Sequence, residues 1–417
     1  MFQTETLSKM DSMNVKVCKH IHGDLALSIT SKLPIKSLIR FGCVCKSWAI
    51  LFQDPHFMNI YRKNFISKNH PDYDGTSYIL RHNVNVQVVD DDDYSQSSLY
   101  FLTGERLENK VKLDCSLPFQ YLGQDIVIMS SRSINGILCV SDGGVNKFAF
   151  WNPSTKEFKI IPPSPIEDTT TYRTCDPLII GFGYDHVRDD YKVLRHVRFG
   201  GLNFYDYAER DLEPEDVPRR YISYEPIWEI YSLRNNSWRE IDVKLPMTLD
   251  HYRSDYIDRF YINGMCHWSY IYDIEETCLV SFDVSNEVFF TTPMPSYMDD
   301  GLDHGLVPQR LVMLINGFVY VISYYEGKTT FHISVLDEIG VRESWTKLFI
   351  IDLLPCVKRP IGGGKNGNIF FIKDKGELVC FDLGTLMIEE LVVNGDLNMS
   401  QMVNYRENFL PIIGMNS

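Results

Sequence analysis

A repeated strand-and-turn motif is the feature of this sequence that most limits the folds open to it. Each copy runs from a turn into apolar and aromatic residues, at Asn135–Val140, Asn263–Trp268, Asn316–Val321 and Gly367–Ile372. Asn316 follows Asn263 by 53 residues, and Gly367 follows Asn316 by 51. A period near 50 with several short strands per unit is typical of a β-propeller, in which each blade buries its faces only by stacking on its neighbours. The period predicts about six blades over residues 75–413.

The gap of 128 residues between Asn135 and Asn263 leaves room for one more unit. That unit runs from Gly181–Asp185 through Trp238. A second motif, a strand that ends at a turn, recurs at Phe150–Pro153, Ile230–Leu233, Ser281–Val284 and Cys380–Leu383. Short aromatic and β-branched runs separated by turn residues indicate a mainly β fold.

The segment before the propeller has a helical pattern instead. Pro34 suits the first turn of a helix, where its missing N–H costs nothing. Apolar residues then recur at steps of three and four, at Leu38, Phe41, Cys45, Trp48 and Phe52. Asp54 and Pro55 supply an N-cap and a first-turn proline for one further helix through Tyr61. The predicted domains are a flexible N-terminus over 1–18, a helical domain over 19–64, a linker over 65–74 and the propeller over 75–413.

The two predicted domains differ in charge. The chain carries a net charge of −14, whereas residues 19–64 hold seven Lys or Arg and two Asp, a balance of +5 that leaves −19 elsewhere. An acidic chain is unsuited to general nucleic-acid binding, because phosphate contact needs clustered Lys and Arg. A basic helical domain suits an acidic protein partner, with local charge fluctuation as the alternative.

Cysteine usage and hydropathy indicate the compartment. None of the ten cysteines forms a C-x-x-C pair. The first residues lack the apolar run of a signal peptide, and no stretch reaches the roughly 20 apolar residues that span a bilayer. We therefore expect free thiols, no membrane segment, and a cytoplasmic location, a nuclear one, or both.

The helical residues resemble the F-box of plant F-box proteins. The resemblance rests on Leu33–Trp48, which reads LPIKSLIRFGCVCKSW, and on Asp54–Phe57, which reads DPHF. Two positions depart from the family pattern. Its usual opening L-P-x-D-L is IHGDL here, at Ile21–Leu25, and Gly42 replaces an arginine within a helix, where glycine costs about 1 kcal/mol relative to alanine.

The rest of the chain resembles the F-box-associated, kelch-repeat-like domain of plant F-box proteins. The matching motifs are Ser133–Cys139, Trp151–Thr155, Gly181–Asp185, Asp190–Val193, Asn236–Arg239 and the closing Tyr405–Phe409. S-locus F-box proteins share this architecture. The resemblance implies a kelch-like β-propeller preceded by a small all-α F-box domain.

Together the resemblances imply the substrate-recognition subunit of a Skp-cullin-F-box ubiquitin ligase. The F-box would bind the Skp adaptor, and through it the cullin, while the propeller would bind a protein target. Such a subunit is a non-catalytic adaptor. Two alternatives stay open: a kelch-propeller enzyme of the oxidase type, which needs Tyr, His and Cys ligands on inner strands, and an F-box protein that works outside a ligase.

The resemblance also implies which residues contact the adaptor. They are Ile21, Leu25, Ile29, Leu33, Pro34, Leu38, Val44, Cys45 and Trp48. An interface of this kind needs apolar anchors at its centre and charged residues at its rim. The alternative for Ile29, Cys45 and Trp48 is a place in the domain's own core.

Target binding is predicted in an insertion from Gly200 to Tyr224. Its acidic residues are Asp206, Glu209, Asp211, Glu213, Glu215 and Asp216. Loops longer than about 15 residues are uncommon unless they are functional or disordered. The acidic side chains suit a basic patch on the target. A disordered loop without a role is the alternative.

No metal, cofactor or catalytic site is predicted. Cys43 and Cys45 lack the paired spacing of a structural zinc site, and on one helix they would point about 200° apart. Gly362–Lys365 reads GGGK, but no Ser or Thr and no helix follow, as a phosphate-binding loop requires. We interpret it as a turn between blades.

Overall fold

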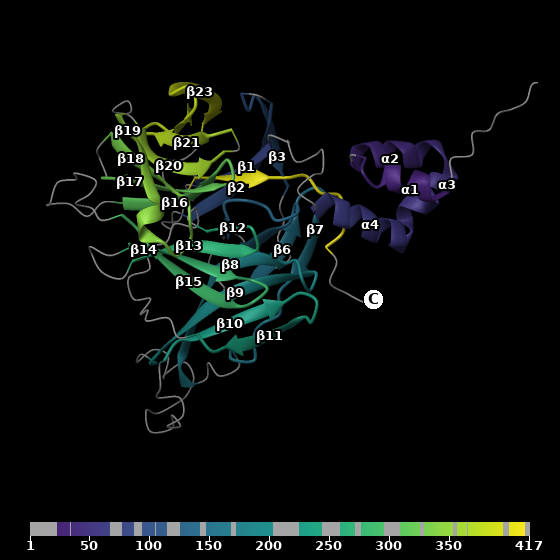
Figure 1. Cartoon of the computed structure of the whole chain (residues 1–417), viewed down its shortest axis with the longest axis horizontal. Helices are drawn as coiled ribbons and strands as arrows, with labels where there is room; N and C mark the ends of the chain where they lie inside the picture. The colour runs from purple at the N-terminus through teal and green to yellow at the C-terminus, as the bar shows by residue number, and fades with distance from the viewer. Residues whose placement is uncertain are drawn as a thin grey trace, which may run out of the picture. The chain divides into compact units, whose positions relative to one another are not determined.

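The structure is a computed structural model that falls into two compact units, Met1–Asp74 and Gly75–Ser417 (Figure 1). It describes residues 23–33, 35–66, 77–86, 94–104, 106–114, 126–141, 147–167, 172–202, 225–243, 259–271, 277–295, 309–325, 329–352, 357–364, 366–394 and 400–412. No helix in these ranges is long and apolar enough to cross a membrane.

The first unit is helical. Its described helices are α1 (Gly23–Thr30), α2 (Ile35–Val44), α3 (Lys46–Gln53) and α4 (Pro55–Ile66). Asp54 caps α4, because its Oδ1 accepts hydrogen bonds from the backbone N–H groups of His56 (2.9 Å) and Phe57 (3.1 Å). The expected end of this helix at Tyr61 is too early, since α4 continues to Ile66.

The second unit contains six four-stranded antiparallel sheets, the blades. Blade 1 contains β24 (Gln401–Tyr405), β1 (Ser77–Val86), β2 (Tyr94–Thr103) and β3 (Asn109–Leu113). Blade 2 contains β4 (Val127–Ile128), β5 (Leu138–Ser141), β6 (Phe148–Asn152) and β7 (Glu157–Ile160). Blade 3 contains β8 (Thr174–Asp185), β9 (Asp190–Gly200), β10 (Ile227–Ser232) and β11 (Ser237–Ile241).

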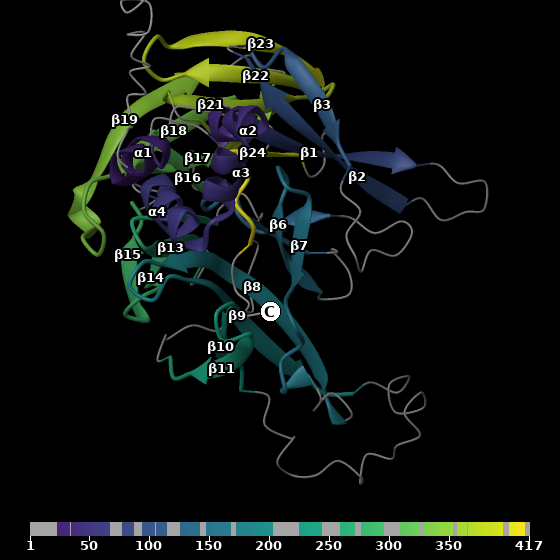
Figure 2. The same ribbon diagram turned by 90° about the vertical axis from the view of Figure 1, so that its right-hand side faces the viewer.

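The other three blades repeat this order. Blade 4 contains β12 (Phe260–Ile262), β13 (Met265–Ile271), β14 (Thr277–Asp283) and β15 (Val288–Pro293). Blade 5 contains β16 (Gln309–Ile315), β17 (Phe318–Tyr324), β18 (Thr330–Leu336), the short 3-10 helix η8 (Arg342–Ser344) and β19 (Trp345–Asp352). Blade 6 contains β20 (Val357–Gly363), β21 (Asn368–Lys373), β22 (Glu377–Asp382) and β23 (Met387–Asn394). Figure 2 shows the blades following one another around a ring, which confirms the predicted six-bladed propeller.

The C-terminal strand closes the ring. β24 pairs with β1 in antiparallel register, from Ser77 opposite Tyr405 to Arg81 opposite Gln401. The last strand of the chain is therefore the first strand of blade 1. This confirms the expected closure through the segment near Tyr405, and it gives β1 a paired strand on each side.

The repeated Asn-Gly pairs are two-residue hairpin turns. Asn263 and Gly264 have φ angles of 52° and 85°, and Asn316 and Gly317 have 49° and 84°. A type I′ turn needs positive φ at both central residues, which asparagine and glycine tolerate best. These turns join the first and second strands of blades 4 and 5, so the motif marks the same place in successive blades.

Apolar side chains fill the space between neighbouring blades. One cluster joins blades 5 and 6, where the rings of Phe331 and Phe371 lie 5.1 Å apart. Further clusters join blades 6 and 1, blades 1 and 2, and blades 4 and 5. In the described residues, blades therefore bury apolar faces against their neighbours, as the period predicts.

The glycine-rich segment at Gly362 lies within a blade. Gly362 and Gly363 end β20, the first strand of blade 6, rather than forming the predicted turn between blades. A Cβ atom at Gly362 would collide with the backbone oxygen of Met402 in β24. Glycine is required here because two first strands approach each other closely.

Candidate functional site

The helical unit exposes several large apolar side chains, which we call the helical apolar surface. Its members and their exposed fractions are Leu25 (57%), Ile29 (50%), Phe41 (38%), Val44 (83%), Trp48 (38%) and Ile50 (70%). Leu25 and Ile29 are four residues apart and share one face of α1. Several exposed apolar side chains on so small a unit suit protein interaction better than single exposed residues do.

A row of aromatic rings supports this surface from within. Phe41, Trp48, Phe52, Phe57 and Tyr61 follow one another with ring centroids 5.2 to 6.1 Å apart. The last two rings are fully buried. The row runs from exposed rings on α2 and α3 to a buried anchor on α4, so the outer rings have fixed positions.

The structure separates the predicted adaptor-contacting residues into three groups. Leu25, Ile29, Val44, Cys45 and Trp48 are exposed, and Leu33 is half-buried. Leu38 requires a correction, because it is only 3% exposed and so belongs to the interior rather than the surface. Ile21 and Pro34 lie outside the described residues. Phe41 and Ile50 are also exposed but were not predicted as contacts, although Phe41 follows the same apolar periodicity.

Cys45 separates two helices. Its backbone is extended, with φ −144° and ψ 126°, so α2 ends at Val44 and α3 begins at Lys46. The expectation that Cys43 and Cys45 share one helix is therefore wrong. The Cys45 Sγ lies 2.8 Å from the Ser47 Oγ, and this hydrogen bond lowers the pKa of the exposed thiol.

The predicted target-binding insertion connects two paired strands of blade 3. β9 ends at Gly200, and β10 begins at Ile227 and pairs with β9 in antiparallel register. The connection therefore lies at the opposite end of the blade from the β8–β9 and β10–β11 turns. Its acidic residues lie outside the described residues: Asp206, Glu209, Asp211, Glu213, Glu215 and Asp216.

Several buried thiols and imidazoles inside the blades have shifted pKa values. Burial raises the pKa of the Cys266 thiol, raises that of Cys380 to about 12, and lowers that of His267 to about 4. The Nδ1 of His267 lies 2.8 Å from the Ser281 Oγ. A protonated thiol is a poor nucleophile and a poor metal ligand. Across the described ranges, no group of three or more His, Cys, Asp or Glu side chains is placed to hold a metal ion.

Two family models match the chain. One is described as an F-box domain and matches residues 23–59, and the other is described as an F-box associated beta propeller domain and matches residues 93–409. These matches confirm both resemblances seen in the sequence. The matching propeller family is the F-box associated one, so the kelch-repeat expectation is supported only in part.

The chain is also similar to plant proteins along most of its length. F-box protein CPR1 of Arabidopsis thaliana is 27% identical over 382 residues, which cover 86% of this chain and 81% of that protein. Putative F-box protein At3g10430 of the same plant is 25% identical over 360 residues, 83% of this chain and 82% of that protein. Among solved structures, an oligogalacturonate lyase in complex with manganese matches with a TM-score of 0.37 and 10% identity, over 73% of this chain and 72% of that one. A likeness this low has no bearing on function.

Proposed function

Because the chain belongs to the family of F-box proteins with an F-box associated β-propeller domain, we propose that it is the substrate-recognition subunit of a Skp-cullin-F-box ubiquitin ligase. The two domains together make it an F-box substrate receptor. In this proposal the helical unit binds a Skp-type adaptor and the propeller binds a protein target. The receptor is non-catalytic, and it promotes ubiquitin transfer by raising the effective concentration of a target lysine near the charged carrier.

The helical apolar surface is the observation that supports adaptor binding. It offers apolar anchors such as Ile29, Val44 and Trp48, and the Trp48 ring packs edge-on against that of Phe41. Arg40 and Lys46, both exposed, lie on the same helices as these anchors. An apolar centre with basic neighbours suits an acidic partner, because the charges speed association while the apolar groups supply affinity.

Adaptor binding should be lost when charge is placed on this surface. We expect the double variant Ile29→Asp, Val44→Asp to bind a purified Skp-type adaptor about 100-fold more weakly, because each aspartate would be buried in an apolar interface without a partner. Isothermal titration calorimetry on the full chain measures the change. Leu38 is unsuitable for this test, because replacing a buried side chain would also damage the helical core.

A matched control places the same charges on exposed apolar residues of the propeller. Val111 and Val187 are 59% and 79% exposed, so the variant Val111→Asp, Val187→Asp should bind the adaptor like the wild-type chain. Adaptor affinity that survives in the Ile29, Val44 variant would show that the contact lies elsewhere.

We also propose that the acidic insertion contributes to target binding. Exchanging Asp211, Glu213, Glu215 and Asp216 for Ser should weaken capture of the target from cell extract. It should also reduce the salt dependence of that capture, since the Debye length falls from about 10 Å at 0.1 M to about 3 Å at 1 M. Adaptor binding, measured on the same samples, should not change. If target capture keeps both its strength and its salt dependence, the insertion has no part in recognition.

Cullin recruitment distinguishes a ligase subunit from an F-box protein that works outside a ligase. A ligase subunit should co-purify with both the adaptor and the cullin and should support ubiquitin transfer. Recovery of the adaptor without the cullin would instead support the second role. We place the complex in the cytosol or nucleus, where free thiols such as Cys266 and Cys380 stay reduced.

A further inference from the structure

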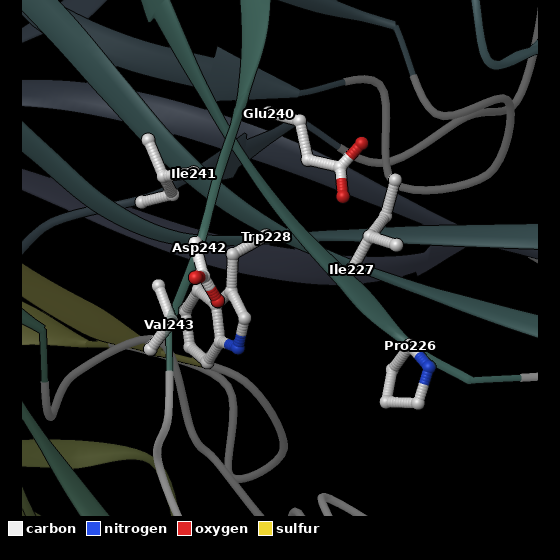
Figure 3. A pocket seen from close by; sticks show the side chains of 7 residues that line it. All are labelled: Pro226, Ile227, Trp228, Glu240, Ile241, Asp242 and Val243. Carbon is white, nitrogen blue, oxygen red and sulfur yellow. The ribbon is translucent and has the colours of Figure 1, made fainter.

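Blade 3 has an open pocket of about 380 Å³ beside β10 and β11. Its lining combines five apolar or aromatic residues with two carboxylates: Pro226, Ile227, Trp228, Ile241, Val243, Glu240 and Asp242 (Figure 3). Trp228 is only 8% exposed, because its ring packs against Trp268 and Phe289 of blade 4 at 6.3 and 5.4 Å. The indole is therefore a fixed wall of the pocket.

The pocket adjoins an open sheet edge. β11 is the last strand of blade 3, and among the described strands it pairs only with β10. Among the described residues, one row of its backbone N–H and C=O groups thus has no strand partner, and such an edge can accept a further strand. An extended peptide that adds to such an edge gains affinity from backbone hydrogen bonds and specificity from pockets beside the strand.

The negative charges at this edge favour a basic peptide. Glu240 and Asp242 are exposed, and within the described part of the chain neither carboxylate has an ion-pair or hydrogen-bond partner. Arg239, on the same strand, is already paired with Glu287. A lysine or arginine fits this pocket well, because its aliphatic stem can lie on apolar walls while its charged head stays near the carboxylates.

We propose that the pocket and the free edge of β11 together bind an extended, basic segment of a protein. The segment adds as a fifth strand to blade 3 and places basic side chains beside the Glu240 and Asp242 carboxylates. That this segment belongs to the ubiquitination target rests on the proposed function. The site is made only of described residues of β10, β11 and their ends, none of which belongs to the acidic insertion.

Three synthetic octapeptides test the proposal. The first alternates Lys and Val, the second alternates Glu and Val, and the third is the Lys and Val peptide N-methylated at every second residue. Fluorescence anisotropy with the full chain measures binding. We expect the first peptide to bind at least about tenfold more tightly than the other two, because the second lacks the complementary charge and the third cannot form one row of backbone hydrogen bonds.

Protein variants locate the binding. The double variant Glu240→Gln, Asp242→Asn should bind the Lys and Val peptide about tenfold more weakly than the wild-type chain does. The control variant Asp337→Asn, Glu338→Gln removes the same charge from the exposed β18–β19 connection and should bind like the wild-type chain. Equal effects of the two variants, or equal binding of the Lys and Glu peptides, would overturn the proposal. Unchanged binding of the N-methylated peptide would overturn strand addition. Adaptor affinity is measured separately, so a failure of the peptide test and a failure of the ligase proposal remain distinguishable.

Discussion

A chain truncated after Met402 is expected to lose its folded propeller. The deletion removes four buried apolar side chains, at Val403, Tyr405, Leu410 and Ile412. Burial of one such side chain contributes about 1.5–3 kcal/mol, whereas the net stability of a folded protein is about 5–15 kcal/mol. The burial free energy lost is therefore comparable to the whole net stability of the fold. The unclosed ring also exposes the edge of β1. Soluble yield and thermal unfolding followed by circular dichroism measure the effect.

Polar contacts show why Tyr405 and the residues after β24 matter as well. The Tyr405 hydroxyl lies 2.6 Å from the Ser154 Oγ of blade 2. The Asn152 Nδ2 donates to the Leu410 carbonyl oxygen at 2.9 Å, and the Ile412 backbone N–H donates to the Glu157 Oε2 at 2.9 Å. Residues 405–412 thus connect blade 1 to the β6–β7 turn of blade 2.

Graded truncations test this account of closure. Truncation after Tyr405 keeps β24 and should give a melting temperature between those of the full chain and the Met402 truncation. Truncation after Gly414 removes none of these contacts and should melt like the full chain. A Met402 truncation that is soluble and melts like the full chain would show that ring closure does not stabilise the propeller.

The blades could be predicted because their tight turns require residues that tolerate a positive φ angle. Only a few residues accept positive φ at both positions of a tight hairpin turn, so Asn263–Gly264 and Asn316–Gly317 identify equivalent places in different blades. The close approach at Gly362 could not be predicted in the same way. It depends on Met402, which is distant in sequence and adjacent only after the ring has closed.

The candidate site was predicted less well, because periodicity identifies an apolar face but not what covers it. Leu38 and Trp48 belong to one apolar pattern, yet Leu38 is buried and Trp48 is 38% exposed. The outcome depends on how the helices pack on one another, which the spacing within α2 and α3 does not specify. The blade 3 pocket was missed for a similar reason, since it forms only when Trp228 and Ile241 meet across two paired strands.

A second large effect is expected at an ion network that joins blade 3 to blade 4. The fully buried Asp185 carboxylate lies 2.7 Å from the Lys192 Nζ and accepts a hydrogen bond from the Ser285 Oγ of blade 4 at 2.8 Å. The Lys192 Nζ also lies 3.1 Å from the Glu287 Oε1 and donates to the Val284 carbonyl oxygen at 3.0 Å. Lys192 thus connects a buried anion of one blade to the β14–β15 turn of the next. The more exposed Arg188 makes a second such connection, since it lies 2.9 Å from the Asp185 carboxylate and donates to the Ser285 carbonyl oxygen at 2.7 Å.

The network gives the stability a defined pH dependence. Burial acts to raise the pKa of Asp185, but hydrogen bonds from Lys192, Ser285 and Arg188 outweigh it and hold the pKa well below its usual value. A carboxyl group whose pKa is lower in the folded than in the unfolded state stabilises the fold above its unfolded pKa, about 3.9 for Asp. That stabilisation is lost as the pH falls from there through the folded pKa.

Replacing Lys192 by Met should lower the free energy of unfolding by about 3–5 kcal/mol at pH 7, because it leaves the Asp185 carboxylate buried without its main cation. Loss of the cation raises the pKa of Asp185, so the carboxyl group of the variant becomes neutral at a higher pH than that of the wild type. The difference in free energy of unfolding between wild type and variant should therefore be largest near neutral pH and should become smaller in acid. Chemical denaturation at a series of pH values measures this difference.

Two further variants separate the charge effect from lost packing. Arg239→Met removes a half-exposed cation that pairs with the same Glu287. It should lower the free energy of unfolding by less than about 1 kcal/mol, because exposed ion pairs contribute no more than that. Adding Asp185→Asn to Lys192→Met should recover part of the lost stability, because the buried anion is then absent. The contrary outcome is a loss in free energy of unfolding that is the same at every pH and that the added Asp185→Asn does not reduce. Lys192 would then stabilise the junction by packing, and the ion network would not hold the two blades together.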